Sequence, residues 1–379
     1  MPGPHDPQSG RSPHDSHSGR PPRDPKSAQP TLRDVAERAG VSAMTASRVL
    51  RDDPQVLPAT RERVRAAATA LGYRPNEVAR SLRLGRGTGL VGLVVTNLAN
   101  PFYSRLALGV DSVVAEHGLK TVIGNTGQDL DAERELVADL VARRVDGIIA
   151  VPAGADQRHL AAAVDGGVPV VLASRPPEGF AADCVLVDDF GGARDATARL
   201  LERGHRRIGF LGSPPAVHTG TERLRGYAAA LTSAGLTVDA RLVRQGQTEP
   251  RQATRAAAEL LALPDPPTAL FCSNNRNTIG AFRALRDVGP KGVGVRGAGG
   301  VRVDGAGVAL AGFDDFELAD ALGLPLTLVA YDSDELGRAA GRLLNDRLHD
   351  RGSGAAGGRA TTGEARQIVV PTSLVEYGT

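Results

Sequence analysis

Apolar residues near the start of the chain recur at helical spacing, in short runs separated by breaks. Thr31 followed by Asp34 has the spacing of a capping box, and Ser42 can cap a second run after Gly40. The expected helices span 32–39, 42–50, 59–71 and 77–84. Two short helices joined by a tight turn, with a third behind them, predict a helix-turn-helix unit.

After Gly85, Gly87 and Gly89 the pattern changes to continuous apolar runs alternating with amphipathic helical stretches. The expected strands are 90–96, 119–124, 146–151, 168–173, 208–212, 269–272 and 308–312. The expected helices between them include 103–117, 131–143, 194–203 and 223–234. Continuous apolar strands spaced by helices predict parallel sheets covered on both faces, and their number requires two doubly wound lobes. Ligands of such folds bind at the carboxyl ends of the strands, here between the lobes.

Two segments lack this pattern. Residues 1–29 hold seven prolines and no Val, Ile, Leu or Phe, so we expect a disordered tail. Its histidines, His5, His14 and His17, are either solvated or able to bind metal, and we expect no metal site.

Residues 289–307 are glycine-rich and resemble an insertion. They contain GxGxxG, but no helical pattern follows, so we expect no nucleotide cofactor there.

Charge separates the two parts of the chain. Residues 1–86 hold 15 Lys and Arg against 9 Asp and Glu, a net charge of +6, and the remainder holds 30 against 34, a net charge of −4. A basic head suggests a polyanionic partner, or alternatively a solvated basic tail.

No apolar run is long enough to cross a bilayer and the start lacks a signal core, so we expect a cytoplasmic protein without a membrane partner. The two cysteines, Cys184 and Cys272, exclude a disulfide scaffold.

The helix-turn-helix pattern assigns candidate DNA contacts to the outer face of the second helix. Arg48 is suited to donate two hydrogen bonds to a guanine edge, although a solvated helix charge is the alternative. Ala43 and Met44 are candidates for thymine methyl groups, and Ser47 and Thr31 for phosphates. The expected DNA-contacting residues of the head are Thr31, Ser42, Ala43, Met44, Thr45, Ser47 and Arg48.

The longer motifs add a family resemblance. TLRDVAERAGVSAMTASRVL and TRERVRAAATALGYRPNEVARSLR resemble the head and hinge of the lactose-repressor (LacI/GalR) family, and NPFYSRLALGV, VDGIIAVP, VPVVLASR, GHRRIGFLG, RLRGYAAAL, GFDD and PTSLVEYG continue the match. The resemblance implies a homodimer, or a higher oligomer, whose heads bind a near-palindromic operator. It also implies a sensor like a type I periplasmic binding protein. We therefore expect a transcriptional repressor controlled by a small-molecule effector.

We divide the chain accordingly. The expected parts are a tail at 1–29, a head at 30–74, a hinge at 75–87 and a sensor at 88–379. The sensor's first lobe is expected at about 88–187 and 332–370, and its second at about 188–330 and 371–379. By the resemblance, Leu82 of the hinge helix enters the minor groove, although alone it would be taken for a buried packing residue. The other hinge residues expected at DNA are Asn76, Ala79 and Arg83.

The same resemblance places an effector between the lobes. The expected effector-binding residues are Phe102, Tyr103, Ser174, Arg175, Arg225, Asn274, Asn275 and Asp314. Arginine and carboxylate pairs suit sugar hydroxyls, so a carbohydrate is the first expectation. Members of the family often have Asp at the positions of Ser174 and Asn275. Because these two carboxylates are missing here, the effector could also be a molecule with fewer hydroxyl groups or with a negative charge. Tyr103 and Asp315 have a packing or capping role as their alternative.

Two other function classes were weighed. An enzyme on the same α/β body is disfavoured because the sequence holds no GxSxG, HExxH, P-loop or Cys-His motif, and His205 is expected to be structural. A solute-binding protein for a transporter shares the body, but the basic head and missing export signal argue against it. We expect a protein without catalytic activity that is associated with the nucleoid.

Overall fold

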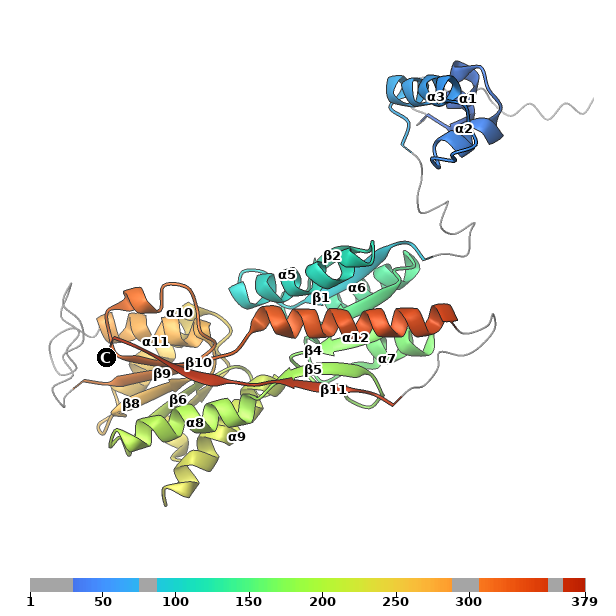
Figure 1. The fold of residues 1–379 in the computed structure, drawn as a ribbon. Coiled ribbons are helices and arrows are strands. Elements are labelled where there is room, and N and C mark those ends of the chain that lie inside the picture. The colour runs from blue at the N-terminus through green and yellow to red at the C-terminus, as the bar shows by residue number, and fades with distance from the viewer. Residues whose placement is uncertain (1–29, 75–86, 288–306, 354–363, 379) are drawn as a thin grey trace, which may run out of the picture. The chain divides into compact units, whose positions relative to one another are not determined.

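A computed structural model describes residues 30–74, 87–287, 307–353 and 364–378 (Figure 1). The chain divides into two compact units, residues 1–84 and 85–379. The expected tail, the hinge helix with Asn76, Ala79, Leu82 and Arg83, and nearly all of the glycine-rich insertion lie outside the described residues.

The first unit contains three short helices around a small core. They are α1 (Leu32–Ala39), α2 (Ala43–Val49) and α3 (Pro58–Leu71), which confirms the three predicted helices in this part of the chain to within one residue at most ends. Small and β-branched side chains make the core: Val35, Ala36, Ala39, Ala46, Val49, Val64, Ala67 and Ala68. The helices therefore approach closely, and a turn of three residues separates α1 from α2.

The second unit contains two six-stranded sheets, which confirms the expected pair of α/β lobes. The first sheet has the order β11-β5-β4-β3-β1-β2, with every pairing parallel. Its strands are β1 (Leu90–Val95), β2 (Lys120–Asn125), β3 (Gly147–Ala150), β4 (Val170–Ala173), β5 (Asp183–Val187) and β11 (Gln367–Val370). The helices that belong with it are α5 (Pro101–Glu116), α6 (Leu130–Ala142), α7 (Arg158–Asp165) and α12 (Ser333–Ser353).

The second sheet has the order β12-β10-β9-β8-β6-β7. Its strands are β6 (Ile208–Gly212), β7 (Val243–Gln245), β8 (Ala269–Cys272), β9 (Ala309–Phe313), β10 (Leu326–Ala330) and β12 (Ser373–Tyr377). The edge strand β12 is the exception to parallel pairing, because it runs antiparallel to β10. The helices of this lobe are α8 (Asp189–Glu202), α9 (His218–Ser233), α10 (Pro250–Leu261) and α11 (Asn275–Asp287), with short 3₁₀ turns η1 (Ala240–Leu242) and η2 (Asp320–Leu322).

The chain crosses between the two lobes three times, after β5, after β10 and after β11. Figure 1 shows β11 and β12 as one nearly continuous ribbon that runs from one sheet to the other. The long helix α12 returns to the first lobe and packs tightly on α5, where a methyl group on Gly109 would collide with the carbonyl oxygen of Asp334. Three chain segments therefore connect the two lobes.

The predicted strands and helices of the sensor are all present, with some different starts. Helix α8 begins at Asp189 rather than at 194, and α9 begins at His218 rather than at 223. The pair Gly191-Gly192 obscured the start of α8, because glycine is a poor helix former. The structure explains one of these glycines, since a side chain at Gly192 would collide with Val329 and Phe313. None of the helices in the described ranges combines the length and apolar character that a membrane crossing requires.

Candidate functional site

The start of α1 and the turn into α2 are fixed by local hydrogen bonds. The backbone N–H of Thr31 donates to Asp34 Oδ2 at 2.7 Å, and the N–H of Asp34 donates to Thr31 Oγ1 at 3.3 Å, which is the predicted capping box. Gly40 then ends α1 with a φ of 65°, and Ser42 Oγ accepts from the N–H of Thr45 at 3.1 Å. Helix α3 starts without a side-chain cap, because Leu57 and Pro58 stand there.

The outer face of α2 is exposed as expected. Ser42, Ala43 and Met44 are exposed, and Met44 is 69% exposed, whereas Thr45, Ser47 and Arg48 are half-buried. Single exposed apolar side chains are common on protein surfaces, so the exposure of Met44 leaves this face available for contact without requiring one. Thr31 and Ser42 use their hydroxyl groups as caps, so their contribution to any contact includes holding the helix ends in place.

Arg48 is not freely solvated. Its Nε donates to Asp53 Oδ2 at 2.8 Å and its Nη2 donates to Gln55 Oε1 at 2.9 Å. The hydrogen bond from Arg48 also helps to lower the pKa of Asp53 below its ordinary value. A guanidinium has five N–H donors, so these two bonds leave three available. The contacts thus orient the group across the turn after α2 without using up its donors.

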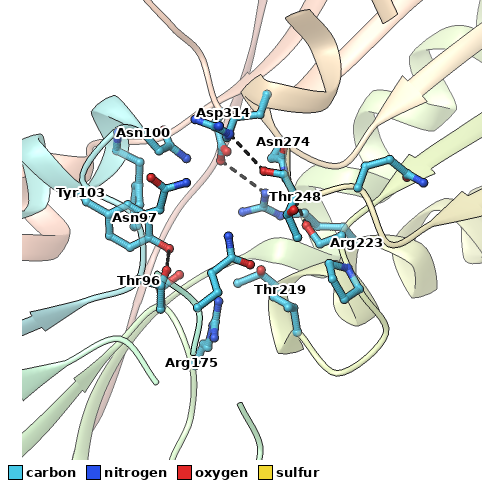
Figure 2. A pocket seen from close by; sticks show the side chains of 18 of the residues that line it. Thr96, Asn97, Asn100, Tyr103, Arg175, Thr219, Arg223, Thr248, Asn274 and Asp314 are labelled. Atoms are coloured by element: carbon cyan, nitrogen blue, oxygen red, sulfur yellow. Dashed lines mark hydrogen bonds and ion pairs between the residues drawn. The ribbon is translucent and has the colours of Figure 1, made fainter. Parts of the chain in front are cut away.

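A cavity in the second unit lies between the two lobes, at the carboxyl ends of the strands (Figure 2). Its free volume of about 80 Å³ is space for roughly five to eight water molecules. Its lining is mostly polar, with an apolar part made by Phe102, Pro214 and Val217. The residues that line it are Thr96, Asn97, Asn100, Phe102, Tyr103, Gln128, Ser174, Arg175, Ser213, Pro214, Val217, Thr219, Arg223, Gln247, Thr248, Asn274, Arg276, Asp314 and Tyr331.

Six of the predicted effector residues line this cavity: Phe102, Tyr103, Ser174, Arg175, Asn274 and Asp314. Asn275 lies beside it and connects the lobes, because its Nδ2 donates to Asn100 Oδ1 at 2.9 Å. The structure corrects the remaining prediction, Arg225. The side chain of Arg225 is 63% exposed and pairs with Glu222 at 2.7 Å, outside the cavity. Arg223, two residues earlier, takes its place, since positions two apart lie on opposite sides of a helix.

Arg223 is the centre of a buried charged cluster. Its Nε donates to Asp189 Oδ1 at 2.7 Å, its Nη1 lies 3.4 Å from Asp314 Oδ1, and the guanidinium stacks 3.6 Å from the centre of the Phe313 ring. Tyr331 donates its hydroxyl to Asp314 at 2.9 Å. Burial raises the pKa of Asp189 to about 6, because loss of hydration outweighs the attraction of Arg223. The cluster therefore presents fixed donors and acceptors to the cavity.

Backbone strain also gathers at this cavity. Gln128, Ser174 and Asp314 line it with φ values of 67°, 65° and 67°, a region that residues other than glycine rarely occupy. Half of the positive-φ residues other than glycine that are described in the chain thus lie at one cavity. Such strain persists where the surrounding structure holds it, and it is frequent at ligand sites.

Several lining residues were absent from the sequence-based set, among them Thr96, Gln128, Ser213 and Gln247. Each follows closely after a strand, namely β1, β2, β6 and β7. A polar residue directly after a buried strand was the signal that would have found Thr96 and Ser213. Gln128 and Gln247 follow the exposed strand β2 and the partly exposed strand β7, so that signal does not reach them. Within the described ranges, no group of three or more His, Cys, Asp or Glu side chains is arranged to hold a metal ion.

Comparison with known proteins identifies a family for each part of the chain. Residues 31–76 match the family of bacterial regulatory proteins of the lacI family, and residues 88–369 match the periplasmic binding proteins and sugar binding domain of the LacI family. The HTH-type transcriptional regulator CelR of Thermobifida fusca is 37% identical over 84% of this chain and 92% of its own length. The HTH-type transcriptional repressor CytR of Escherichia coli K12 is 30% identical over 86% of this chain and 92% of its own.

Solved structures show the same likeness. A transcriptional regulator CelR–cellobiose complex matches with a TM-score of 0.65 and 34% identity, over 92% of this chain and all of the other. The lac repressor dimer bound to operator and the anti-inducer ONPF matches with a TM-score of 0.73 and 27% identity, over 92% and 98% of the two chains. This chain therefore belongs to the LacI family of bacterial transcriptional regulators, DNA-binding proteins that join a helix-turn-helix head to a sensor of the periplasmic-binding-protein type.

Proposed function

We propose that the chain acts as a homodimeric repressor, in which the exposed face of α2 enters the major groove of a near-palindromic operator. The observation that carries this proposal is the face itself: a helix capped at Ser42, anchored through Ala46 and Val49, with Ala43 and Met44 directed outward. In helix-turn-helix proteins the early residues of the second helix contact base edges. Thr31, Thr45 and Ser47 then serve the flanking phosphates.

Arg48 is the proposed reader of a guanine. A bidentate contact to guanine O6 and N7 requires two donors, and the three that Asp53 and Gln55 leave free are sufficient. Asp53 acts as a positioning residue, because its carboxylate holds the Nε edge of the guanidinium. The hinge residues Asn76, Ala79, Leu82 and Arg83 are proposed, by family resemblance, to contact the minor groove, with Leu82 as the wedge.

The dimer is proposed to form along the first lobe. Leu108 on α5 and Val122 and Ile123 on the edge strand β2 are 67%, 43% and 45% exposed, and α5 and β2 pack together. An edge strand beside exposed apolar side chains is a surface suited to association. The lac repressor structure that this chain resembles is a dimer. Two identical heads per assembly would require an operator with two similar half-sites, and such a protein would act on the nucleoid, in the cytoplasm.

The cavity between the lobes is the proposed effector site, for a sugar or sugar derivative. Its donors and acceptors suit hydroxyl groups, and the related CelR structure is a complex with cellobiose. A ligand that binds one lobe arrangement better shifts the population toward it, and couplings of this kind are typically ~1–3 kcal/mol. The relatives are regulators, which supports a sensor without catalytic activity.

Selection of duplexes from a random library by the full chain tests this proposal. We expect the enriched sequences to share an inverted repeat, and we expect two chains to bind each duplex in analytical ultracentrifugation. Enrichment of a single unrepeated half-site by one chain would exclude the homodimer. If no duplex is enriched at any salt concentration, the assignment of α2 as the DNA-reading helix is wrong.

A further inference from the structure

Arg175 is a buried arginine at the cavity whose charge has no carboxylate partner. Arg175 is 8% exposed. Its Nη1 donates to the carbonyl oxygen of Pro152, and its Nε has no hydrogen-bond partner. Among the described residues no acidic side chain pairs with it. Burial lowers the pKa of this guanidinium below its ordinary value, since the charged form has lost its hydration. An arginine held in this way lacks the partner that a buried charge normally has.

The other two arginines at the cavity are already paired. Arg223 contacts Asp189 and Asp314, and Arg276 contacts Glu249. Glu133 and Asp189 attract Arg175 from a greater distance, but both have nearer partners. The carboxylate of Glu133 accepts from the N–H of Ala153 at 2.5 Å and lies 2.8 Å from His159 Nε2, and Asp189 accepts from Arg223. The positive charge of Arg175 is therefore the one that a ligand in the cavity can still neutralise.

The start of α9 adds a second feature to the same part of the cavity. This 16-residue helix begins without a side-chain cap and without an acidic residue in its first turn. Val217, at its cap position, and Thr219 both line the cavity. Burial lowers the pKa of His218, Glu222 opposes that shift, and Arg175 is close enough to add to it. Figure 2 shows Thr219 and Arg175 toward the same end of the pocket, carried by different lobes. The first N–H groups of a helix favour a negative ligand group.

We propose that the effector carries a carboxylate or phosphate group, which binds between Arg175 of the first lobe and the N-terminus of α9 of the second. The proposal rests on the proposed function, because it describes the ligand of that same cavity. The cavity's volume limits the ligand to a compact molecule, so a monosaccharide acid or a monosaccharide phosphate is the class that fits. The negative group would draw the lobes together, because its two partners belong to different lobes.

Thermal unfolding of the full chain with added anions tests this subsite directly. The probes are inorganic phosphate, D-glucuronate, glucose 6-phosphate and neutral D-glucose, each against sodium chloride at matched ionic strength. For a site of about 1 mM affinity, 10 mM phosphate should raise the Tm by roughly 2 °C. Glucuronate and glucose 6-phosphate should exceed glucose by at least tenfold in affinity, and the stronger of the two identifies the group as carboxylate or phosphate.

Two variants and one control make the result specific. Arg175→Gln should abolish the phosphate-dependent rise in Tm, whereas Arg225→Gln removes an equal charge outside the cavity and should retain it. Thr219→Asp places a carboxylate at the start of α9, so it should also abolish the rise while leaving the Tm without phosphate unchanged or higher, which a folding defect would not do.

Three results would overturn the inference. They are no stabilisation by any anion beyond chloride, equal affinity for glucose and its anionic derivatives, and retention of the phosphate effect in both Arg175→Gln and Thr219→Asp. Each of these leaves operator binding untouched, so the duplex selection decides the proposed function separately.

Discussion

At the residue scale, the orientation of Arg48 decides whether the head reads sequence or only charge. The Nε–Asp53 bond fixes the plane of the guanidinium, and a fixed plane loses less entropy when it pairs with a base. The flexible alternative, a solvated arginine, would contact phosphates wherever they came within reach. The hydrogen bonds of Arg48 to Asp53 and Gln55 are therefore consistent with the proposed contact to a base.

Replacing Arg48 by Ala should relax the choice of base at one position in each half-site. We expect a loss of ~1–3 kcal/mol against the preferred base and little change against the other three, because only the preferred base accepts two hydrogen bonds. Asp53→Asn should give the same pattern with a smaller loss, since the guanidinium would be less well oriented. Fluorescence anisotropy with duplexes varied at that position measures both effects.

Arg65→Ala is the charge-matched control for these variants. Arg65 lies on α3 and pairs with Asp52, both well exposed. Its removal should leave base preference unchanged. A uniform loss of affinity across all duplexes for Arg48→Ala would show that Arg48 contacts phosphate instead.

Single residues also show where sequence reasoning reached its limit. The candidates Asp314 and Ser174 were identified from motifs, and both line the cavity. The choice of Arg225 over Arg223 failed because the motif RLRGY holds two arginines, and only the phase of α9 decides which one faces inward. The positive φ of Ser174 and Asp314 has no local signature, since neither is a glycine.

At the element scale, one buried carboxylate connects three elements of the first lobe. Asp183, at the start of β5, accepts from Nη2 of Arg347 on α12 at 2.7 Å and from the backbone N–H of Arg366, just before β11, at 2.8 Å. Burial alone would raise the pKa of Asp183, but the bonds from Arg347 and Arg366 hold it below its ordinary value. Asp183 thus holds α12, which follows the second lobe crossing, and β11, which precedes the third.

Asp183→Asn should destabilise the sensor by about 3 kcal/mol at neutral pH, because it leaves two arginines without their buried partner. The pKa of Asp183 is lower in the folded chain than its ordinary value of 3.8. Its carboxylate therefore stabilises the folded state at pH values above 3.8, and this contribution is lost as the pH falls through the folded-state pKa. Urea unfolding of the unchanged chain and of Asp183→Asn measures their free energies of unfolding. The difference between the two values should be smaller below pH 3.5 than at pH 7. A difference that is the same at both pH values would contradict this role.

The elements themselves were predictable where the pattern is long and regular. Strands such as β1 and β6 are buried apolar runs, and the sequence located them within one residue. Five of the described strands were not predicted: β5, β7, β10, β11 and β12. The strands β7, β11 and β12 lie at sheet edges and are partly exposed, whereas the buried strands β5 and β10 carry polar residues, Asp183 and Thr327, that interrupt the apolar run. Their pairing, including the antiparallel β12, follows from the chain crossings and not from local sequence.

At the scale of the whole molecule, two opposite charge balances accompany two kinds of site. The first 86 residues carry a net charge of +6 and the remainder carries −4. A basic head is attracted to DNA without regard to sequence, so its specificity must come from α2 and the proposed hinge contacts. The sensor adds a cavity that both lobes line. Both parts belong to one chain here.

The ratio of affinities for a selected duplex and for the same duplex with its half-sites scrambled tests this central claim most directly. At physiological salt we expect the full chain to bind the selected duplex at least a thousandfold more tightly. Both affinities should fall steeply as salt rises, since phosphate contacts contribute to each. Equal affinity for the two duplexes, or binding that does not depend on salt, would show that this chain does not read DNA through α2.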